Sequence, residues 1–206
     1  MKLNAQQLRE LEEKRVMGEI RQVKRNPIYF ILENIYDTYN IGGLFRLADA
    51  LAIKKIYLVG DTEIPPNSRI KKASIGTYKV VNWLYKKTTK DAIDDLSSKF
   101  KVQSSKLQLK TQKEKNLGSN IYHLTSPQII AVEQHPNAIN YTAAVYRLPL
   151  ALIFGNESYG ITKETLNLAD QIVEIPMWGI NRSLNVIVSA AIVSYYAMTK
   201  LNKQPQ

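Results

Sequence analysis

Short apolar runs alternate with amphipathic segments along most of the chain. Continuous apolar runs are typical of strands buried on both faces of a parallel sheet, and they occur at 28–32, 55–59, 80–85, 129–132, 150–154 and 171–175. Helical spacing of apolar residues follows or separates them, at 43–51, 91–99, 163–168 and 183–201. Strands that alternate with helices predict an α/β fold, with a mostly parallel sheet and helices on both faces.

Two segments depart from this alternation. Residues 1–26 are amphipathic but rich in charge, which indicates an N-terminal helical arm. From about 103 to 126 the pattern dissolves into polar and basic residues, so we interpret this stretch as an insertion. The main domain is therefore expected to span residues 27–206.

Composition excludes several classes of site. The chain contains no cysteine, so disulfides, thiolate catalysis and cysteine-ligated metals are excluded. The two histidines, His123 and His135, are too isolated to suggest a metal centre, and we expect none. The N-terminus lacks the apolar core of a signal peptide, and the most apolar stretch, 184–198, is shorter than the ~20 residues that cross a bilayer. We predict a cytoplasmic protein without membrane contact.

Charge points to a partner. The formal net charge is +10, and residues 71–115 hold twelve lysines but four acidic residues. A concentrated basic region favours an RNA-binding surface over a merely solvated one. The candidate RNA contacts are seven lysines of this basic region: Lys71, Lys72, Lys101, Lys106, Lys110, Lys113 and Lys115.

Three separated segments share one design, an apolar run that ends in glycine, asparagine and an ionisable residue. They are NIGGLFR at 40–46, LIFGNESYG at 152–160 and IPMWGINRSLNV at 175–186. Each is expected where a strand stops and a helix begins, the edge at which open α/β sheets bind ligands. Together they predict one composite site. The phosphate-binding glycine patterns of nucleotide sites are missing, so a phosphate-cradled nucleotide is not expected.

Four side chains in these segments have both a structural and a functional interpretation. Arg46, in an apolar helix, is either a buried ion pair or a substrate contact suited to phosphate. Glu157 and Ser183 could serve helix starts, Glu157 through the helix dipole and Ser183 as an N-cap. Asn185 is expected inside an apolar helix, where a buried amide needs partners.

These motifs, in this order, resemble those of the SpoU (TrmH-like) RNA ribose 2′-O-methyltransferases, a branch of the SPOUT superfamily. The resemblance covers roughly residues 27–200 and includes KASIG at 72–76. It implies a C-terminal trefoil knot, which is an exception to the rule that chains are not knotted. It also implies S-adenosylmethionine as the methyl donor, held by Leu152, Gly155, Asn156, Ile175, Met177, Ser183 and Leu184.

The resemblance also assigns the chemistry. Arg46 would lie nearest the ribose 2′-hydroxyl and engage the adjacent phosphate, while Asn40, Glu157, Ser183 and Asn185 would orient it, the nucleotide and the cofactor. Because arginine is a poor base, we favour a phosphate-orienting role for Arg46 over proton removal. Homodimers are usual in the family, and the last helix is apolar nearly all round, as a helix covered on more than one side should be.

The leading hypothesis is a methyltransferase that acts on the ribose of structured tRNA or rRNA. The alternative is a catalytically inactive RNA-binding relative that serves RNA folding or ribosome assembly. A methyltransferase for a small molecule or a protein is disfavoured by the lysine-rich stretch.

Overall fold

The computed structural model describes residues 23–100, 126–181 and 183–202. Nearly all of the expected N-terminal arm and insertion lie outside these residues, and so do the candidate RNA contacts Lys101, Lys106, Lys110, Lys113 and Lys115. Within the described end of the arm, residues 23–25 are not helical, and Asn26 already belongs to the first described strand.

A parallel sheet forms the centre of the molecule, as the sequence predicts. Its order is β3-β2-β1-β6-β4-β7-β5, and every neighbouring pair is parallel. The strands are β1 (Asn26–Glu33), β2 (Ile53–Val59), β3 (Trp83–Lys86), β4 (Gln128–Val132), β5 (Ile139–Asn140), β6 (Leu150–Phe154) and β7 (Gln171–Glu174). The short edge strand β5 is not predicted by the pattern, because its two exposed residues form no apolar run.

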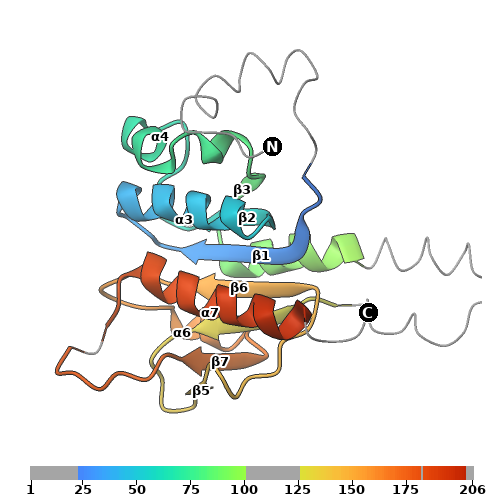
Figure 1. The fold of residues 1–206 in the computed structure, drawn as a ribbon, viewed down its shortest axis with the longest axis vertical. Helices are drawn as coiled ribbons and strands as arrows, with labels where there is room; N and C mark the ends of the chain where they lie inside the picture. Colours follow the sequence, from blue (N-terminus) through green and yellow to red (C-terminus); the bar gives the residue numbers. More distant parts are fainter. Residues whose placement is uncertain (1–22, 101–125, 182, 203–206) are drawn as a thin grey trace, which may run out of the picture.

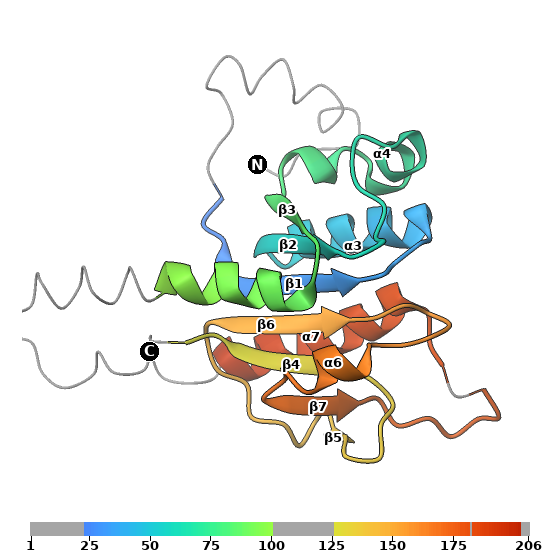
Figure 2. The same ribbon diagram turned by 180° about the vertical axis from the view of Figure 1, so that it is seen from behind.

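Both faces of the sheet are apolar because successive strand residues point to opposite sides. In β1, Phe30 and Leu32 belong to one core cluster, whereas Tyr29 and Ile31 belong to the other. The first cluster is covered by α3 (Thr38–Ala50) and α7 (Val186–Asn202), which lie in front of the sheet in Figure 1. The second is covered by a helix at 89–100 and by α6 (Lys163–Leu166), seen from behind in Figure 2.

Helix α3 begins earlier than the sequence suggests, and this changes the role of two glycines. The carboxylate of Asp37 caps the helix by accepting a hydrogen bond from the backbone N–H of Tyr39 at 2.8 Å. Gly42 and Gly43 therefore lie inside α3, not in a loop that a ligand approaches. A Cβ at Gly42 would lie 2.4 Å from the Cβ of Ala73 in α4 (Ser68–Ser74), and one at Gly43 would lie 2.4 Å from Cδ1 of Ile187 in α7.

Helix α7 begins later than predicted, at Val186. Ser183 consequently lies before the helix and is not its N-cap, and Asn185 is exposed at the helix start instead of buried inside it. Similarly, the predicted strand at 80–85 starts only at Trp83, because residues 80–82 form a turn directly after the short 3-10 helix η1 (Thr77–Lys79). In the described part of the chain, no helix has both the length and the apolar character needed to cross a membrane.

A largely enclosed arginine lies directly before β1. The guanidinium of Arg25 pairs with Asp49 of α3 at 3.1 Å and donates hydrogen bonds to the backbone carbonyls of Ile53 and Val80. Its side chain is only 11% exposed. Arg25 therefore connects the start of β1 with α3 and β2. Because its guanidinium is engaged in these contacts, it is not available to bind RNA.

Candidate active site at the carboxyl edge of the sheet

All three predicted motifs leave the sheet at one edge. Because the strands are parallel, the carboxyl ends of β1, β6 and β7 lie on the same side, where their arrowheads point in Figure 2. The first motif enters α3 directly after β1, the second forms the loop after β6, and the third is the segment between β7 and α7. Three segments that are distant in the sequence, one helical and two in loops, therefore lie at the same ends of the strands.

A chain of hydrogen bonds joins the three motifs. The amide nitrogen of Asn40 donates to the carboxylate of Glu157, which is a short contact, and the amide oxygen of Asn40 accepts from Nδ2 of Asn185 at 2.9 Å. Asn40 is buried, with 6% of its surface exposed, whereas Glu157 and Asn185 are exposed. We call this set the Glu157–Asn40–Asn185 chain. One buried amide thus links residues that are 117 and 145 positions away in the sequence.

The same chain fixes the start of α7. While its Nδ2 donates to Asn40, the side-chain oxygen of Asn185 accepts from the backbone N–H of Ile187 at 2.9 Å. The backbone carbonyl of Asn185 accepts from the backbone N–H of Ser189 at 3.0 Å. Asn185 is thus the residue that caps α7, a role that the sequence suggests for Ser183.

A pocket of about 310 Å³ lies beside this chain, between the ends of β4, β6 and β7. We call it the acidic pocket, because three glutamates line it. Seven of the predicted site residues line it: Gly155, Asn156, Glu157, Ile175, Met177, Ser183 and Leu184. Leu152 does not line it, because that side chain is buried in the core within β6.

Negative charge predominates in this pocket. Glu133, Glu157 and Glu174 line it, and no lysine or arginine does among the residues that the structure describes. Carboxylates favour a cationic ligand and disfavour a phosphate. Glu133 is not among the residues identified from the sequence, although an acidic residue directly after the β4 run is a usable signal.

The loop after β6 is held by its own side chains. Oδ1 of Asn156 accepts from the backbone N–H groups of Ser158 and Tyr159, at 2.8 and 3.0 Å, and its Nδ2 donates to the carbonyl of Asn34 at 2.8 Å. Gly160 adopts a φ of +69°, and a Cβ there would lie 2.5 Å from a carboxylate oxygen of Glu133. This glycine is therefore required by the loop itself, not by a ligand.

The third motif exposes apolar side chains. Trp178 and Ile180 are 93% and 102% exposed, and a Cβ at Gly179 would meet no atom within 4 Å. Such exposure is unusual for large apolar residues. Met177, next to Trp178, lines the acidic pocket. This segment therefore presents apolar surface at the rim of the site.

Arg46 lies apart from the acidic pocket. It is exposed on α3, and it makes no hydrogen bond or ion pair with the described residues, which excludes the buried ion pair considered from the sequence. Six residues separate it from Asn40, so the two side chains leave the helix in different directions. Lys71 and Lys72 are likewise exposed, on α4.

The chain is similar in sequence to proteins named as RNA methyltransferases. A tRNA (guanosine(18)-2′-O)-methyltransferase from Escherichia coli K12 is 28% identical over 177 residues, which are 84% of this chain but 64% of that protein. Its counterpart from Thermus thermophilus is 27% identical over 184 residues, 89% of this chain and 80% of that protein. The chain thus spans just under two thirds of the Escherichia coli relative.

The fold is shared with solved structures. The SpoU methyltransferase AviRb from Streptomyces viridochromogenes, in complex with the cofactor AdoMet, superposes with a TM-score of 0.66 at 19% identity, covering 86% of this chain and 62% of that one. The model of the SpoU rRNA Methylase family matches residues 27–195, most of the chain and all three motifs. The chain belongs to the SpoU rRNA methylase family.

Proposed function

We propose that the protein is an S-adenosylmethionine-dependent methyltransferase that modifies the ribose 2′-hydroxyl of a tRNA or rRNA nucleotide. The observation that carries this proposal is the Glu157–Asn40–Asn185 chain, which joins the three family motifs beside the acidic pocket. The relatives of this chain are named as tRNA 2′-O-methyltransferases, which supports the same reaction class.

The acidic pocket fits S-adenosylmethionine by its charge. When bound, this cofactor supplies a methyl group on a positively charged sulfur. The carboxylates of Glu133, Glu157 and Glu174 would favour that charge, and the backbone around Gly155, Met177 and Leu184 would hold the remainder. Ile175 contributes less through its carbonyl, which already accepts a hydrogen bond from Gln134 at 2.8 Å. Leu152 would act only indirectly, by packing beneath the loop after β6.

Arg46 would bind the RNA backbone next to the acceptor ribose. An exposed guanidinium without a partner among the described residues can form two parallel hydrogen bonds to a phosphate. Holding the phosphate fixes the position of the 2′-hydroxyl, and positioning of this kind contributes much of the rate in group transfer. Hydrogen bonds of Asn40 to Asn185 and Glu157 hold the start of α7 and the loop after β6 in fixed positions. Ser183 lines the acidic pocket.

The catalytically inactive alternative receives no support from the relatives, which carry enzyme names. Of the five residues proposed for the chemistry, Glu157 and Asn185 are each hydrogen bonded to Asn40. We therefore retain the enzymatic hypothesis. A role in RNA folding or ribosome assembly would be considered only if the protein transferred no methyl group to RNA.

We further propose a homodimer that uses the outer face of α7. Val188 and Tyr195 on this helix are 45% and 50% exposed, which is more than a stably solvated helix needs. Arg46 does not line the acidic pocket of its own chain, so a second protomer is one way to complete the site. Sedimentation of the wild type and of Val188→Asp tests this, because the charge should dissociate the dimer.

Two finer features follow from family membership. We propose that the C-terminal part of the chain forms the trefoil knot of SPOUT proteins; the return of α7 to α3 supports it, and stretching single molecules would reveal a contour shorter than that of a free chain. Because its proposed substrates are tRNA or rRNA, we also propose that the protein acts in the cytoplasm.

The decisive experiment has two steps. Calorimetry with S-adenosylmethionine tests cofactor binding, and incubation with tRNA and rRNA from cells that lack the gene tests methyl transfer. Mass spectrometry of the digested RNA should then find one new 2′-O-methylated nucleoside. Cofactor binding without any methylated nucleoside, in either RNA class, would contradict the proposed reaction.

A further inference from the structure

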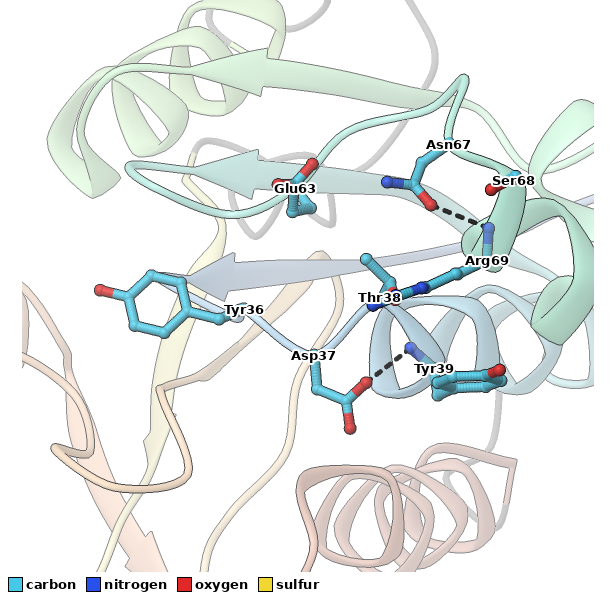
Figure 3. A pocket seen from close by; sticks show the side chains of 8 residues that line it. All are labelled: Tyr36, Asp37, Thr38, Tyr39, Glu63, Asn67, Ser68 and Arg69. Carbon is cyan, nitrogen blue, oxygen red and sulfur yellow. Dashed lines mark hydrogen bonds between the residues drawn. The ribbon is translucent and has the colours of Figure 1, made fainter.

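A second pocket lies at the same edge of the sheet, between the ends of β1 and β2. Its volume is about 280 Å³, and it is lined by Tyr36, Asp37, Thr38, Tyr39, Glu63, Asn67, Ser68 and Arg69. Figure 3 shows the two tyrosine rings at opposite ends, with the side chain of Arg69 reaching in between them. Thr38 and Tyr39 immediately precede Asn40, so this pocket adjoins the Glu157–Asn40–Asn185 chain. We call it the tyrosine pocket.

Some of the lining side chains are already hydrogen bonded, whereas others are not. Asp37 and Asn67 are engaged in the structure, since each caps the helix that follows it by accepting from a backbone N–H, at 2.8 and 2.9 Å. Tyr36, Glu63 and Arg69 are exposed and make no side-chain hydrogen bond with the described residues. The hydroxyl of Tyr39 likewise has no partner among them. Four side chains in one pocket are therefore available to a ligand.

Their chemistry matches single-stranded RNA. Tyr36 and Tyr39 are 49% and 52% exposed, and exposed aromatic rings are the surfaces on which unpaired bases stack. The guanidinium of Arg69 suits the phosphate that links two bases. The carboxylate of Glu63 can accept hydrogen bonds only, so it can read the N–H groups of a base edge.

Other ligands fit less well. A free phosphate or an acidic peptide would engage Arg69 alone and leave the two tyrosine rings and the Glu63 carboxylate unused. A divalent cation would be repelled by Arg69, and one carboxylate oxygen of Asp37 is already used by the helix cap. A ligand with stacking faces, N–H donors and an intervening phosphate satisfies all four available side chains.

The position along α3 extends this surface. Tyr39 and Arg46 are seven residues apart in one helix, which is two turns, so they lie on the same face. Both are exposed. A strand of RNA that leaves the tyrosine pocket along α3 would therefore meet Arg46, the residue proposed to hold the phosphate beside the acceptor ribose.

We propose that the tyrosine pocket binds a single-stranded segment of the substrate RNA, with one base stacked on Tyr36, a neighbouring base on Tyr39 and the phosphate between them on Arg69. The proposal rests on the function proposed above and names the part of the RNA that this site selects, an unpaired dinucleotide in a loop or at an end. Glu63 discriminates among bases at this position.

The test measures RNA binding and cofactor binding separately. Tyr36→Ala and Tyr39→Ala are compared with Tyr36→Phe and Tyr39→Phe, and Tyr85→Ala serves as the control, because Tyr85 is 44% exposed on edge strand β3 and lines neither pocket. Filter binding uses tRNA and rRNA from cells that lack the gene, without cofactor. Calorimetry measures S-adenosylmethionine.

Each alanine variant should weaken binding of the substrate RNA about 5- to 100-fold, as expected for one lost stacked base. The phenylalanine variants and Tyr85→Ala should bind like the wild type, and the affinity for S-adenosylmethionine should not change in any of them. Arg69→Gln should in addition reduce the salt dependence of binding by about one phosphate contact.

Two outcomes separate this proposal from the proposed function. If the wild type methylates RNA but both alanine variants bind and methylate normally, the tyrosine pocket is not an RNA site, although the enzyme assignment stands. If RNA binding depends on the tyrosines but no methyl transfer occurs, the pocket is supported and the reaction is wrong. Equal losses in the alanine and phenylalanine variants would overturn stacking as the mode of binding.

Discussion

The carboxyl edge of the sheet has two halves that differ in chemistry. The half formed by β4, β6 and β7 holds the acidic pocket, with three glutamates and no basic residue among those described. The half formed by β1, β2 and the helices that follow them carries exposed tyrosines together with Arg46, Arg69, Lys71 and Lys72. Asn40 lies at the boundary, because its side chain contacts the first half while its neighbours Thr38 and Tyr39 line the second.

This separation matches the opposite charges of the two proposed substrates. A sulfonium donor is favoured by carboxylates, and a polyanion is repelled by them. The other half also holds two carboxylates in the tyrosine pocket, Asp37 and Glu63, but the four cations Arg46, Arg69, Lys71 and Lys72 outnumber them, so this half can bind phosphate and bases. The two ligands therefore require different surfaces, and the reaction requires the surfaces to be adjacent.

The largest effect is expected from Arg46→Ala. Methyl transfer should fall at least about 100-fold, because the phosphate beside the acceptor ribose loses its anchor. The fold and the affinity for S-adenosylmethionine should be unchanged, since Arg46 is exposed and lies outside the acidic pocket. Turnover assays and calorimetry measure the two quantities. Lys54→Ala, an exposed cation on β2, is the control, and near-normal turnover of the Arg46 variant would refute the role assigned to it.

Asn40→Ala should destabilise the protein at the boundary between the two halves. It removes the amide that connects Glu157 with Asn185, with an expected loss of about 1 kcal/mol of unfolding free energy. Adding Asn185→Ala should cost less than the two single effects together, because the pair shares one hydrogen bond. Thermal unfolding measures this, with Asn137→Ala as an exposed control. Strict additivity would show that the hydrogen bond contributes nothing.

Glu174→Gln tests whether the negative charge of the acidic pocket contributes to cofactor binding. The side chain is half-buried in the lining of the acidic pocket and makes no side-chain hydrogen bond with the described residues, so its loss should change charge and little else. S-adenosylmethionine should bind about threefold more weakly. S-adenosylhomocysteine, whose sulfur is neutral, should be affected less. Calorimetry with both ligands measures the two affinities, and Glu164→Gln on α6 is the control. If Glu174→Gln weakened the binding of both ligands equally, recognition of the sulfonium charge would be excluded.

The smallest effect is expected from Asp95→Asn, behind the sheet. Burial alone would raise the pKa of the Asp95 carboxyl, but hydrogen bonds from Lys99 and Tyr57 outweigh it and lower the pKa to about 2. A lowered pKa in the folded state stabilises the protein above the ordinary pKa of 3.8, and that stability is lost as the pH falls toward 2. The variant should therefore be less stable than the wild type at pH 7.

The difference should be at most about 1 kcal/mol, because the partners are partly exposed, and it should shrink below pH 3.8. Thermal unfolding across this pH range measures it. Neither ligand should bind differently, since Asp95 lines neither pocket. A changed affinity for RNA or cofactor would mean that the two halves of the edge are not the whole binding surface.

Much of the fold can be predicted from the sequence, because a strand that is buried on both faces of a parallel sheet consists of consecutive apolar residues. The continuous apolar runs locate β1, β2, β4, β6 and β7 within one or two residues. The segment 40–46 is misplaced by the same reasoning, because its glycines suggest a loop. The capping pattern at Asp37, three residues before Asn40, is the better signal for where α3 begins.

The site is predictable in its members but not in its connections. The motifs identify Asn40, Glu157 and Asn185, yet no local pattern indicates that the first donates to the second and accepts from the third. Asn185 is expected to be buried, since its neighbours in α7 are apolar. The fold places it at the end of the helix instead, where an exposed amide can serve as a cap. The tyrosine pocket joins loops from two different strands, and such proximity is visible only in three dimensions.

The Glu157–Asn40–Asn185 chain has a fixed direction. A carboxylate can only accept, so Asn40 must turn its amino group toward Glu157 and its oxygen toward Asn185. Asn185 must then turn its own oxygen toward the N–H of Ile187. A single negative charge in one loop therefore dictates the orientation of two distant amides. Neutralising Glu157 should therefore speed hydrogen exchange at the backbone N–H of Ile187, in the first turn of a helix to which Glu157 makes no hydrogen bond among the described residues.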